Sequence, residues 1–542
     1  MSTLKQQAGI ASRSDAESEH RTTGERKRAL DGRSAPREMF DVVVVGGGGT
    51  GLAASLEARS LGRSVVLLEK NPQVGGTTAW SVGSISASNT PHQRRAGILD
   101  SPEDHVEDMI KFAAHDKRFG ENGELAPQEN PALRRLLVEN VTSTIPWLMS
   151  KGVVFFGPMP EAPHRKPRMH NIVPNSRAYI YHLERHAIKD GVDIRVNHQL
   201  VRLIRDGDRV IGALCQAPDG SLKEFIARGG VVLATGDYSA NPEMKAHYIS
   251  EEAARIPPVN PTSTGDGQRI ATEIGARVLN GHLSFFSLRF VAPTRKPLVQ
   301  KIPPWPFLMR FMVWALANLP QKLLRPFILG YVTTFLVPEL GLLTKGGMLV
   351  NNRGQRFIEE TERPEMALLE QPDQCGYVIM DDATAKKFSA WPHFVSTAPG
   401  VAFAYLPDYR RNRPDIYASA PTIRGLADKL GIPAAALEKT LEKYNASAPG
   451  KNRPQLLKGP FHSLGPIKNM MGFSDGGLAI NDKLQVVDQQ DRPIPGLFAA
   501  GSAGQGGLLL LGHGNHLGWG FTSGRIAGRN AAYQATTADA AS

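Results

Sequence analysis

A glycine-rich turn directly follows a short run of β-branched residues, and this pairing limits the folds open to the chain. Val42–Val45 predicts a strand buried on both faces, and Gly46, Gly48 and Gly51 follow in the spacing G-x-G-x-x-G. In this spacing one glycine forms the tight turn, one lets the backbone approach a pyrophosphate, and one lets a helix pack on a strand. The helix expected from Leu52 onward would point its free N–H groups at the phosphates.

A second strand and an acidic residue extend this pattern. Val65–Leu68 is another short apolar run, and Glu69 follows it, eighteen residues after Gly51. A carboxylate at this position can accept hydrogen bonds from both hydroxyl groups of an adenosine ribose. Strand, glycines, helix, strand and acid in this order predict a dinucleotide-binding α/β domain, whereas the glycines alone would also suit a turn in an unrelated α/β protein.

Further small-residue segments favour FAD over NAD as the dinucleotide. The loop Gly75–Thr78 follows Glu69 closely and could reach the phosphates and the flavin edge. Gly230–Asp237 and Gly496–Gly501 each read as a strand that ends in small residues, and a helix-like segment follows from about Leu517 to Ala531. Four separated segments that converge on one ligand suit a long dinucleotide lying through a discontinuous domain.

Together these motifs resemble the fumarate reductase/succinate dehydrogenase flavoprotein superfamily, and among its branches the 3-ketosteroid dehydrogenases. The motifs are GGTTA, ATGD, TGDG at Thr264–Gly267, GGMLVNNRGQRF at Gly346–Phe357, and PGLFAAG. The resemblance runs from about Phe40 to Ala532. It implies an α/β fold with a Rossmann-like, discontinuous FAD-binding domain and an inserted α+β domain that caps the substrate.

The implied FAD site consists of glycines, hydroxyl side chains and a few charged residues. The resemblance assigns Val201 a backbone contact to the adenine, and places Gly518 and Gly520 near a helix N-terminus that would stabilise negative charge on the flavin. It implies that FAD is bound non-covalently, because the GGTTAWS segment offers no histidine for a covalent bond. The predicted cofactor-binding residues are Gly46, Gly48, Gly49, Thr50, Gly51, Glu69, Lys70, Gly75, Gly76, Thr77, Thr78, Ser81, Val201, Ala234, Thr235, Gly236, Asp266, Gly501, Gly518 and Gly520.

Composition limits the other redox groups and the partners. The 542 residues include only two cysteines, Cys215 and Cys375, without a C-x-x-C motif. This pattern predicts no iron–sulfur cluster, no covalently attached haem and no disulfide framework, and no metal site is expected. Electrons would therefore pass to a separate acceptor, a quinone or a redox protein, in a reducing, cytoplasmic compartment. The net charge of +11 suits anionic lipid, and the lack of a recognition motif argues against nucleic acid.

The expected organisation has four parts. Residues 1–38 are polar and lack periodicity and an apolar signal-peptide core, so we expect a disordered tail and no secretory signal. The FAD-binding domain is expected over 39–285 and again over 461–535. The capping and substrate domain is expected over 286–460.

An unusually apolar stretch, residues 302–343, lies inside the expected cap. It holds two apolar runs joined by the basic linker QKLLR, and neither run offers about twenty uninterrupted apolar residues. Aromatic residues crowd together with Arg310, Lys322 and Arg325. This composition is typical of an element that lies on a membrane surface, here the cytoplasmic face of a membrane, and a buried core hairpin is the alternative.

The resemblance also indicates which catalytic groups are altered. Fumarate reductases grip a dicarboxylate with a histidine and an arginine, and these two positions fall on Phe473 and His516. Their proton-donating arginine is nearly matched by Arg363, which lies one residue early relative to Phe357. Arg363 could be a proton donor, a pocket charge or an ordinary surface arginine. A dicarboxylate substrate is therefore not expected.

The pattern of the ketosteroid dehydrogenases is incomplete as well. Their C-terminal tyrosine falls on about Leu510, beside an apolar wall and the two histidines His513 and His516. A neutral imidazole there could take a proton or hydrogen-bond a ketone, or the histidine could serve a structural hydrogen bond. A tyrosine from elsewhere could replace the missing base; the candidates are Tyr179, Tyr181, Tyr238 and Tyr331.

These features predict an FAD-dependent oxidoreductase acting on CH–CH bonds, with His513, His516 and Arg363 as candidate catalytic residues. The expected reaction is α,β-dehydrogenation, or the reverse ene-reduction, of an apolar ketone such as a 3-ketosteroid or cyclic ketone, with hydride transfer at flavin N5. The alternatives are a fumarate-reductase-like enoate reductase acting on an unusual carboxylate, and a flavoprotein electron-transfer subunit of a membrane complex.

Overall fold

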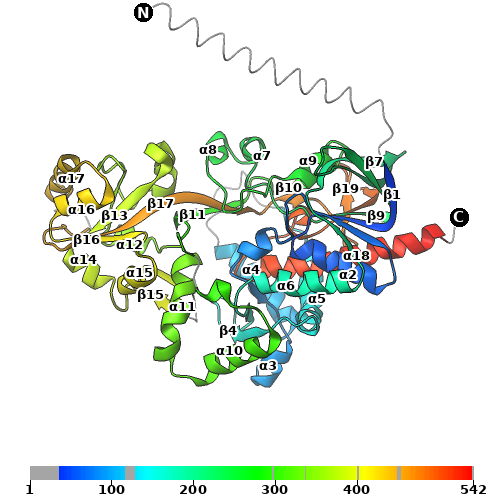
Figure 1. Ribbon diagram of the computed structural model, residues 1–542, viewed down its shortest axis with the longest axis horizontal. Coiled ribbons are helices and arrows are strands. Elements are labelled where there is room, and N and C mark those ends of the chain that lie inside the picture. The colour runs from blue at the N-terminus through cyan, green and yellow to red at the C-terminus, as the bar shows by residue number, and fades with distance from the viewer. Residues whose placement is uncertain are drawn as a thin grey trace, which may run out of the picture.

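The computed structural model describes residues 36–115, 128–295, 298–335, 337–398, 402–448 and 453–539. Two α/β lobes lie side by side, each built around its own sheet (Figure 1). The first strand begins at Arg37, so residues 37 and 38 belong to the sheet, although a disordered tail was expected there. The remainder of the expected tail, residues 1–35, lies outside the described residues.

The larger sheet has the order β19-β20-β9-β1-β2-β6, with β8 paired to β9 and β7 to β8. The contacts of β1 with β2 and β9, of β2 with β6 and of β20 with β9 are parallel, and Val42 lies opposite both Val65 and Gly230. The carboxyl ends of these strands therefore meet at one edge. The strands are β1 (Arg37–Val45), β2 (Val65–Leu68), β6 (Asp193–Arg195), β7 (Gln199–Asp206), β8 (Arg209–Gln216), β9 (Leu222–Leu233), β19 (Gln485–Val487) and β20 (Pro493–Ala499).

Two helices pack closely on each other beside this sheet, α2 (Gly49–Ser60) and α18 (Asn515–Asp539). A Cβ at Gly528 of α18 would lie only 2.1 Å from the Ala54 carbonyl oxygen, so the contact requires glycine there. The helix expected from Leu52 begins three residues earlier, at Gly49. The same lobe holds α3 (Pro91–Arg95), α4 (Pro102–His115), α5 (Pro131–Ser150), α6 (Arg177–Lys189), α7 (Pro242–Tyr248), α8 (Glu251–Ala254), α9 (Asp266–Thr272), and the short strands β3 (Ser84–Ser86), β4 (Phe155–Met159), β5 (Met169–Ile172), β10 (Val278–Leu279) and β18 (Gly477–Leu478).

The smaller lobe surrounds a sheet of five strands with the long strand β17 (Phe461–Ser474) at its centre. β17 pairs with β11 (Ser284–Phe290), β13 (Gly376–Met380) and β16 (Tyr417–Ala420), all antiparallel. The second part of the FAD-binding domain was expected to begin at residue 461. β17 begins at that residue, but it belongs to the sheet of the smaller lobe. The other elements are β12 (Met348–Val350), β14 (Ser396–Ala398), β15 (Ala402–Ala404), α13 (Pro364–Ala367), α14 (Asp382–Lys387), α15 (Leu406–Asn412), α16 (Ile423–Leu430) and α17 (Ala434–Ala446).

The apolar stretch 302–343 forms three helices, α10 (Pro306–Asn318), α11 (Gln321–Phe335) and α12 (Gly341–Thr344). Leu329 and Val332 of α11 are buried in the core of the smaller lobe. Within the described ranges, none of the helices combines the length and the hydropathy needed to cross a bilayer.

Candidate functional site

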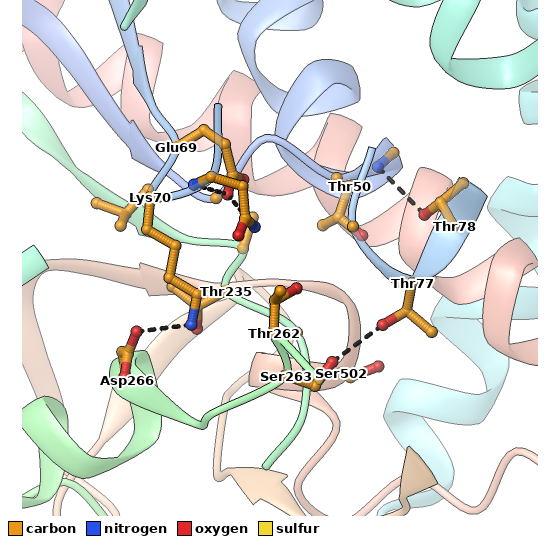
Figure 2. Close-up of a pocket in the computed structure, with 18 of the residues that line it drawn as sticks. Thr50, Glu69, Lys70, Thr77, Thr78, Thr235, Thr262, Ser263, Asp266 and Ser502 are labelled. Carbon is orange, nitrogen blue, oxygen red and sulfur yellow. Dashed lines mark hydrogen bonds and ion pairs between the residues drawn. The ribbon is translucent and has the colours of Figure 1, made fainter. Parts of the chain in front are cut away.

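A cavity opens at the edge where the carboxyl ends of the parallel strands meet. Its walls come from the residues that follow β1, β2, β9 and β20, as expected for the ligand site of an open α/β sheet (Figure 2). Three side chains, Lys70, Thr77 and Thr235, reach it from three different loops. The predicted cofactor residues that line it are Gly46, Gly48, Gly49, Thr50, Glu69, Lys70, Gly76, Thr77, Thr78, Ala234, Thr235, Gly236 and Asp266.

The three glycines of the first turn are required for three different reasons. Gly46 has a φ of +107°, which favours glycine. A Cβ at Gly51 would lie 1.9 Å from the Gly46 carbonyl oxygen, so this glycine allows α2 to approach β1. A Cβ at Gly48 would meet no protein atom closer than 3.9 Å. Gly48 therefore leaves open space in the cavity floor, where a ligand backbone can approach.

Glu69 holds the glycine turn from the end of β2. Its Oε2 accepts a hydrogen bond from the Gly47 N–H (2.6 Å), and its Oε1 accepts bonds from the backbone and side-chain N–H groups of Asn71 (2.8 and 2.7 Å). The side chain is buried yet lines the cavity. Oε2 accepts one of these bonds and keeps a second lone pair, so the same group can position the turn and accept from a ribose hydroxyl.

The opposite wall is a network of hydroxyl and amide groups. The Thr77 and Ser263 hydroxyls lie 3.1 Å apart (Figure 2). Asn260 Nδ2 donates to Thr77 Oγ1 (2.8 Å). Lys70 Nζ pairs with Asp266 Oδ2 at 3.0 Å. The sequence reasoning missed Asn260, Thr262 and Ser263, although they directly precede the TGDG motif.

Two buried polar atoms of the cavity wall have no hydrogen-bond partner among the described residues. These atoms are Nε2 of His198 and Oγ1 of Thr235. His198 Nδ1 lies 2.8 Å from the Val196 carbonyl oxygen, which makes Nδ1 the protonated nitrogen and leaves Nε2 as an acceptor. Unpartnered buried groups in a cavity are typical of sites that bind a polar ligand. His198 was also missed by the sequence reasoning.

Seven predicted cofactor residues support the cavity from outside its wall. Gly51, Gly75 and Ser81 shape the first two loops: Gly75 bridges Gly48, and Ser81 Oγ donates to the Thr78 carbonyl (2.8 Å). Val201 lies in β7 beside Leu200, which lines the cavity. Of the last three, Gly518 and Gly520 lie in α18 and Gly501 precedes it. A Cβ at Gly501 or Gly520 would approach Thr50, whereas a Cβ at Gly518 would approach Val141 of α5.

A second polar group lies where β17 ends and α18 begins. His516 Nε2 lies 2.7 Å from Asp475 Oδ1, and Gln505 Nε2 donates to the same oxygen at 3.0 Å. The His516 ring contacts Phe473 at 4.4 Å between centroids, and Phe473 stacks on Phe285 of β11 at 5.3 Å. The two positions that the resemblance matched to the dicarboxylate-binding residues of fumarate reductases are thus adjacent here, and they hold a phenyl ring and an imidazole.

Buried carboxyl groups surround this histidine. Asp475 is 4% exposed, and Asp237, which directly follows the cavity residue Gly236, is buried as well. The pKa of Asp237 is raised to about 6, chiefly by burial and also by Asp475, while Ser239 and His516 act to lower it. Sequence reasoning missed Asp475 because nothing in the sequence pairs it with His516.

The other two candidate catalytic residues lie in different surroundings. The side chain of His513 is 52% exposed, and its Nδ1 and backbone N–H both bond to Glu161. This hydrogen bond raises the pKa of His513, against the opposing effect of burial. Arg363 is 71% exposed, and its guanidinium lies 3.6 Å from Glu365. The structure thus places Arg363 at the surface, as in the surface-arginine interpretation.

The tyrosines considered as replacement bases are also placed. The hydroxyls of Tyr179 and Tyr238 are buried and donate to the carbonyls of Gly83 and Gly281. Burial raises the pKa of Tyr238 well above its usual range. Tyr181 is half-buried, and the side chain of Tyr331 lies outside the described residues. Leu510, at the family's tyrosine position, is packed in the core.

Comparison with known proteins decides the family. The family model described as FAD binding domain matches residues 41–296 and 307–511. The chain belongs to this FAD-binding family. It is an FAD-dependent oxidoreductase of the fumarate reductase superfamily, as the motifs predicted.

Three curated relatives of this flavoprotein are reductases or dehydrogenases. The chain is 27% identical to the NADH:fumarate oxidoreductase of Klebsiella pneumoniae over 87% of its own length, but it spans only 45% of that protein. It is 29% identical to the probable fumarate reductase Ifc3 of Shewanella frigidimarina, covering 93% of this chain and 76% of the relative. It is 25% identical to the 4-oxocyclohexanecarboxylate 2-dehydrogenase of Sinomonas cyclohexanicum, covering 93% and 95%.

Solved structures confirm the predicted fold class. An open conformation of a flavocytochrome c3 fumarate reductase matches with a TM-score of 0.70 and 26% identity, over 95% of this chain and 81% of that chain. The 3-ketosteroid Δ1-dehydrogenase of Sterolibacterium denitrificans shares the fold with a TM-score of 0.62 and 19% identity, over 91% and 99%.

The cavity fits the FAD that this family binds. The open floor at Gly48, the uncapped N-terminus of α2, and the unpartnered atoms of His198 and Thr235 offer space and hydrogen-bonding groups along the cavity. FAD bound here supplies a hydride acceptor or donor.

Proposed function

We propose that this flavoprotein interconverts the saturated and α,β-unsaturated forms of an apolar, uncharged carbonyl compound such as a cyclic ketone. The observation that carries the proposal is the contact of His516 with the stacked pair Phe473 and Phe285. At the two positions that the resemblance matched to dicarboxylate-binding cationic groups, this chain has Phe473 and His516. The relative named for 4-oxocyclohexanecarboxylate supports the cyclic-ketone part of this proposal, although that ketone itself carries a carboxylate.

The charges near His516 support an uncharged substrate. Asp475 and Asp237 are both buried carboxyl groups, and Asp475 lies within hydrogen-bond distance of His516. A substrate carboxylate brought close to an ionised Asp475 in a medium of low dielectric constant would be repelled. A ketone oxygen carries no charge and can accept a hydrogen bond from a protonated imidazole.

His516 is the proposed proton-transfer group. Because Nε2 lies against Asp475, that nitrogen carries the proton, and Nδ1 is left to take a proton from the substrate α-carbon or to return one. Asp475 is a positioning residue that holds the ring and stabilises its charged form. The phenyl rings of Phe285 and Phe473 exclude water from this side of the ring.

The electron acceptor is proposed to be a separate quinone or redox protein. Both cysteines are buried and unpaired, and within the described parts of the chain no cluster of histidine, cysteine and acidic side chains is arranged to hold a metal ion.

The test is anaerobic stopped-flow bleaching of the bound flavin, with cyclohexanones and 3-ketosteroids compared against succinate and related acids. We expect ketones alone to bleach the flavin, and His516→Ala to slow bleaching by about 100-fold or more. His513→Gln, which alters the exposed histidine, serves as the matched control and should slow it far less. Bleaching by acids alone would contradict the proposal.

A second candidate is an enoate reductase acting on an unusual carboxylate, and Arg289 is the observation that favours it. This residue of β11 places its Nη2 3.9 Å from where a Cβ at Gly472 would lie, next to Phe473. Its guanidinium could supply a cation that positions 473 and 516 lack. Oxidation of reduced flavin by an enoate, lost in Arg289→Gln, would favour this candidate.

A further inference from the structure

Helix α10 exposes aromatic side chains that a helix of a globular domain normally buries. Along this thirteen-residue helix only Met309 and Ala315 are buried. Trp305 at its start, Phe307, Phe311 and Trp314 are 47–70% exposed, and Leu323 at the start of α11 is 69% exposed. The rings form two stacked pairs, Trp305 with Phe307 and Phe311 with Trp314. We call Trp305, Phe307, Phe311, Trp314 and Leu323 the apolar ridge.

The apolar ridge is mounted on well-packed elements. Met309 is fully buried, and α11, which continues from the ridge, sends Leu329 and Val332 into the core of the smaller lobe. The backbone of Pro304 accepts a hydrogen bond from His182 of α6 in the larger lobe. Figure 1 shows α10 at the lower edge of the molecule, below β4 and beside α3. The ridge therefore projects from a supported helix.

The charged residues in the stretch of sequence around the ridge are all basic. Residues 291–338 contain no aspartate or glutamate and six basic residues, Arg295, Lys296, Lys301, Arg310, Lys322 and Arg325. Three of them, Arg295, Lys301 and Arg310, are exposed, and Arg310 lies on α10 between Phe307 and Phe311. The whole chain carries a net charge of +11. This surface is complementary to an anionic one.

We propose that α10 and the start of α11 dock on the surface of an anionic lipid bilayer, with the apolar ridge inserted at the level of the headgroups. Exposed tryptophan and phenylalanine flanked by arginine and lysine match the chemistry of that interface, where rings sit among acyl chains and cations meet phosphates. A second copy of this chain is a poorer occupant, because a symmetric contact through this surface would place the same basic residues opposite each other. This inference does not depend on the substrate proposed above.

The test is co-sedimentation of the FAD-loaded protein with phosphatidylcholine vesicles, with and without about 30% phosphatidylglycerol. We expect binding to the anionic vesicles that falls steeply toward about 0.5 M salt, where charges are screened. Phe307→Ser combined with Phe311→Ser should weaken binding by at least about tenfold, since two exposed rings are removed. Arg310→Glu should weaken it as well and reduce its salt dependence.

The controls separate docking from general stickiness and from misfolding. Leu457→Ser combined with Tyr533→Ser removes two side chains that are 68% and 54% exposed elsewhere, and should leave vesicle binding unchanged. The flavin spectrum and Tm of every variant report folding. In addition, lipids brominated in the acyl chains should quench tryptophan fluorescence, and Trp305→Phe combined with Trp314→Phe should remove most of that quenching.

Three results would overturn the proposal. The first is no binding to anionic vesicles at low salt. The second is equal loss of binding in the ridge variant and in the control variant. The third combines two observations: the unmodified protein sediments as a dimer and does not bind vesicles, and the ridge variant sediments as a monomer. That result would assign the surface to a contact between copies of this chain.

Discussion

His516 Nε2 and Asp475 Oδ1 lie 2.7 Å apart at the junction of β17 and α18, with Asp475 4% exposed. The two residues are 41 positions apart in the chain. This pair fixes which nitrogen of His516 faces the protein and therefore which one can face a substrate.

Replacing Asp475 by asparagine should slow flavin reduction. The Asp475→Asn side chain keeps a hydrogen-bond acceptor at His516 Nε2 but removes the carboxylate beside the ring. The rate should fall about tenfold, because a proton arriving on the ring is no longer offset by a neighbouring negative charge. Stopped-flow reduction by a substrate ketone measures the effect. In the background of His516→Ala, the same change should have no effect on the rate; an effect there would disprove the positioning role.

Two alanine substitutions in the glycine turn should have opposite consequences. The Cβ of Gly48→Ala would meet no protein atom within 3.9 Å, so we expect an unchanged Tm of the FAD-free protein and FAD binding weakened about tenfold or more. The Cβ of Gly51→Ala would lie 1.9 Å from the Gly46 carbonyl oxygen, so the fold itself should lose stability. Fluorescence titration with FAD and thermal melts of the FAD-free proteins separate the two. Equal destabilisation by both substitutions would contradict the role assigned to Gly48.

His198 should contribute to FAD affinity through its unpartnered Nε2. His198→Phe keeps a ring but removes the acceptor, and we expect FAD binding to weaken about three- to tenfold, the effect of one hydrogen bond. His462→Phe is the matched control, since the Nε2 of His462 is also buried without a partner among the described residues but lies in the smaller lobe. FAD release measured by flavin fluorescence is the readout. Equal weakening by both variants would mean that the cavity position of His198 is irrelevant.

The pair of His513 and Glu161 should stabilise the fold in a pH-dependent way. The bond to Glu161 raises the pKa of His513 above its ordinary value of 6.5. The stabilisation is therefore complete below pH 6.5 and is lost as the pH rises through the raised pKa. The Tm difference between the unmodified protein and His513→Gln should be largest at about pH 5.5 and shrink toward about pH 9. Glu161→Gln should show the same trend, and a difference independent of pH would rule out the charge effect.

Asp237 should make stability fall as the pH rises from 3.8 to about 6. Its pKa is raised to about 6 from 3.8. As the pH rises, the unfolded chain therefore loses this proton at a lower pH than the folded protein does. Stability decreases as the pH rises between these two values. Asp237→Asn cannot ionise and can still accept the Ser239 N–H bond at Oδ1 (2.8 Å). We expect its Tm to exceed that of the unmodified protein at neutral pH and to match it near pH 3.8. Thermal melts of the FAD-loaded protein across this range test the prediction.

Sequence patterns were sufficient to predict the strand, turn and helix of the dinucleotide site. Gly46, Gly51 and Glu69 are constrained by conformations and contacts set within a few residues or along two adjacent strands, and such constraints leave a readable spacing. Twenty cofactor residues were expected, and the cavity is lined by thirteen of them. The seven others support it from behind, because spacing shows that a residue is near a loop but does not show which way its side chain points.

The surroundings of the candidate catalytic residues depend on the folded chain. The partner of His516 is Asp475, the partner of His513 is Glu161, 352 residues away, and Arg363 lies at the surface. These relationships depend on where β17, α18 and the strands of the smaller lobe come together. No periodicity or spacing in the sequence predicts that arrangement. Likewise, the composition of residues 302–343 suited either a core hairpin or an interface element. The folded chain buries Leu329 and Val332 of α11 and exposes most of α10. Long-range packing selects among side chains that are locally equivalent, so its result is visible only in three dimensions.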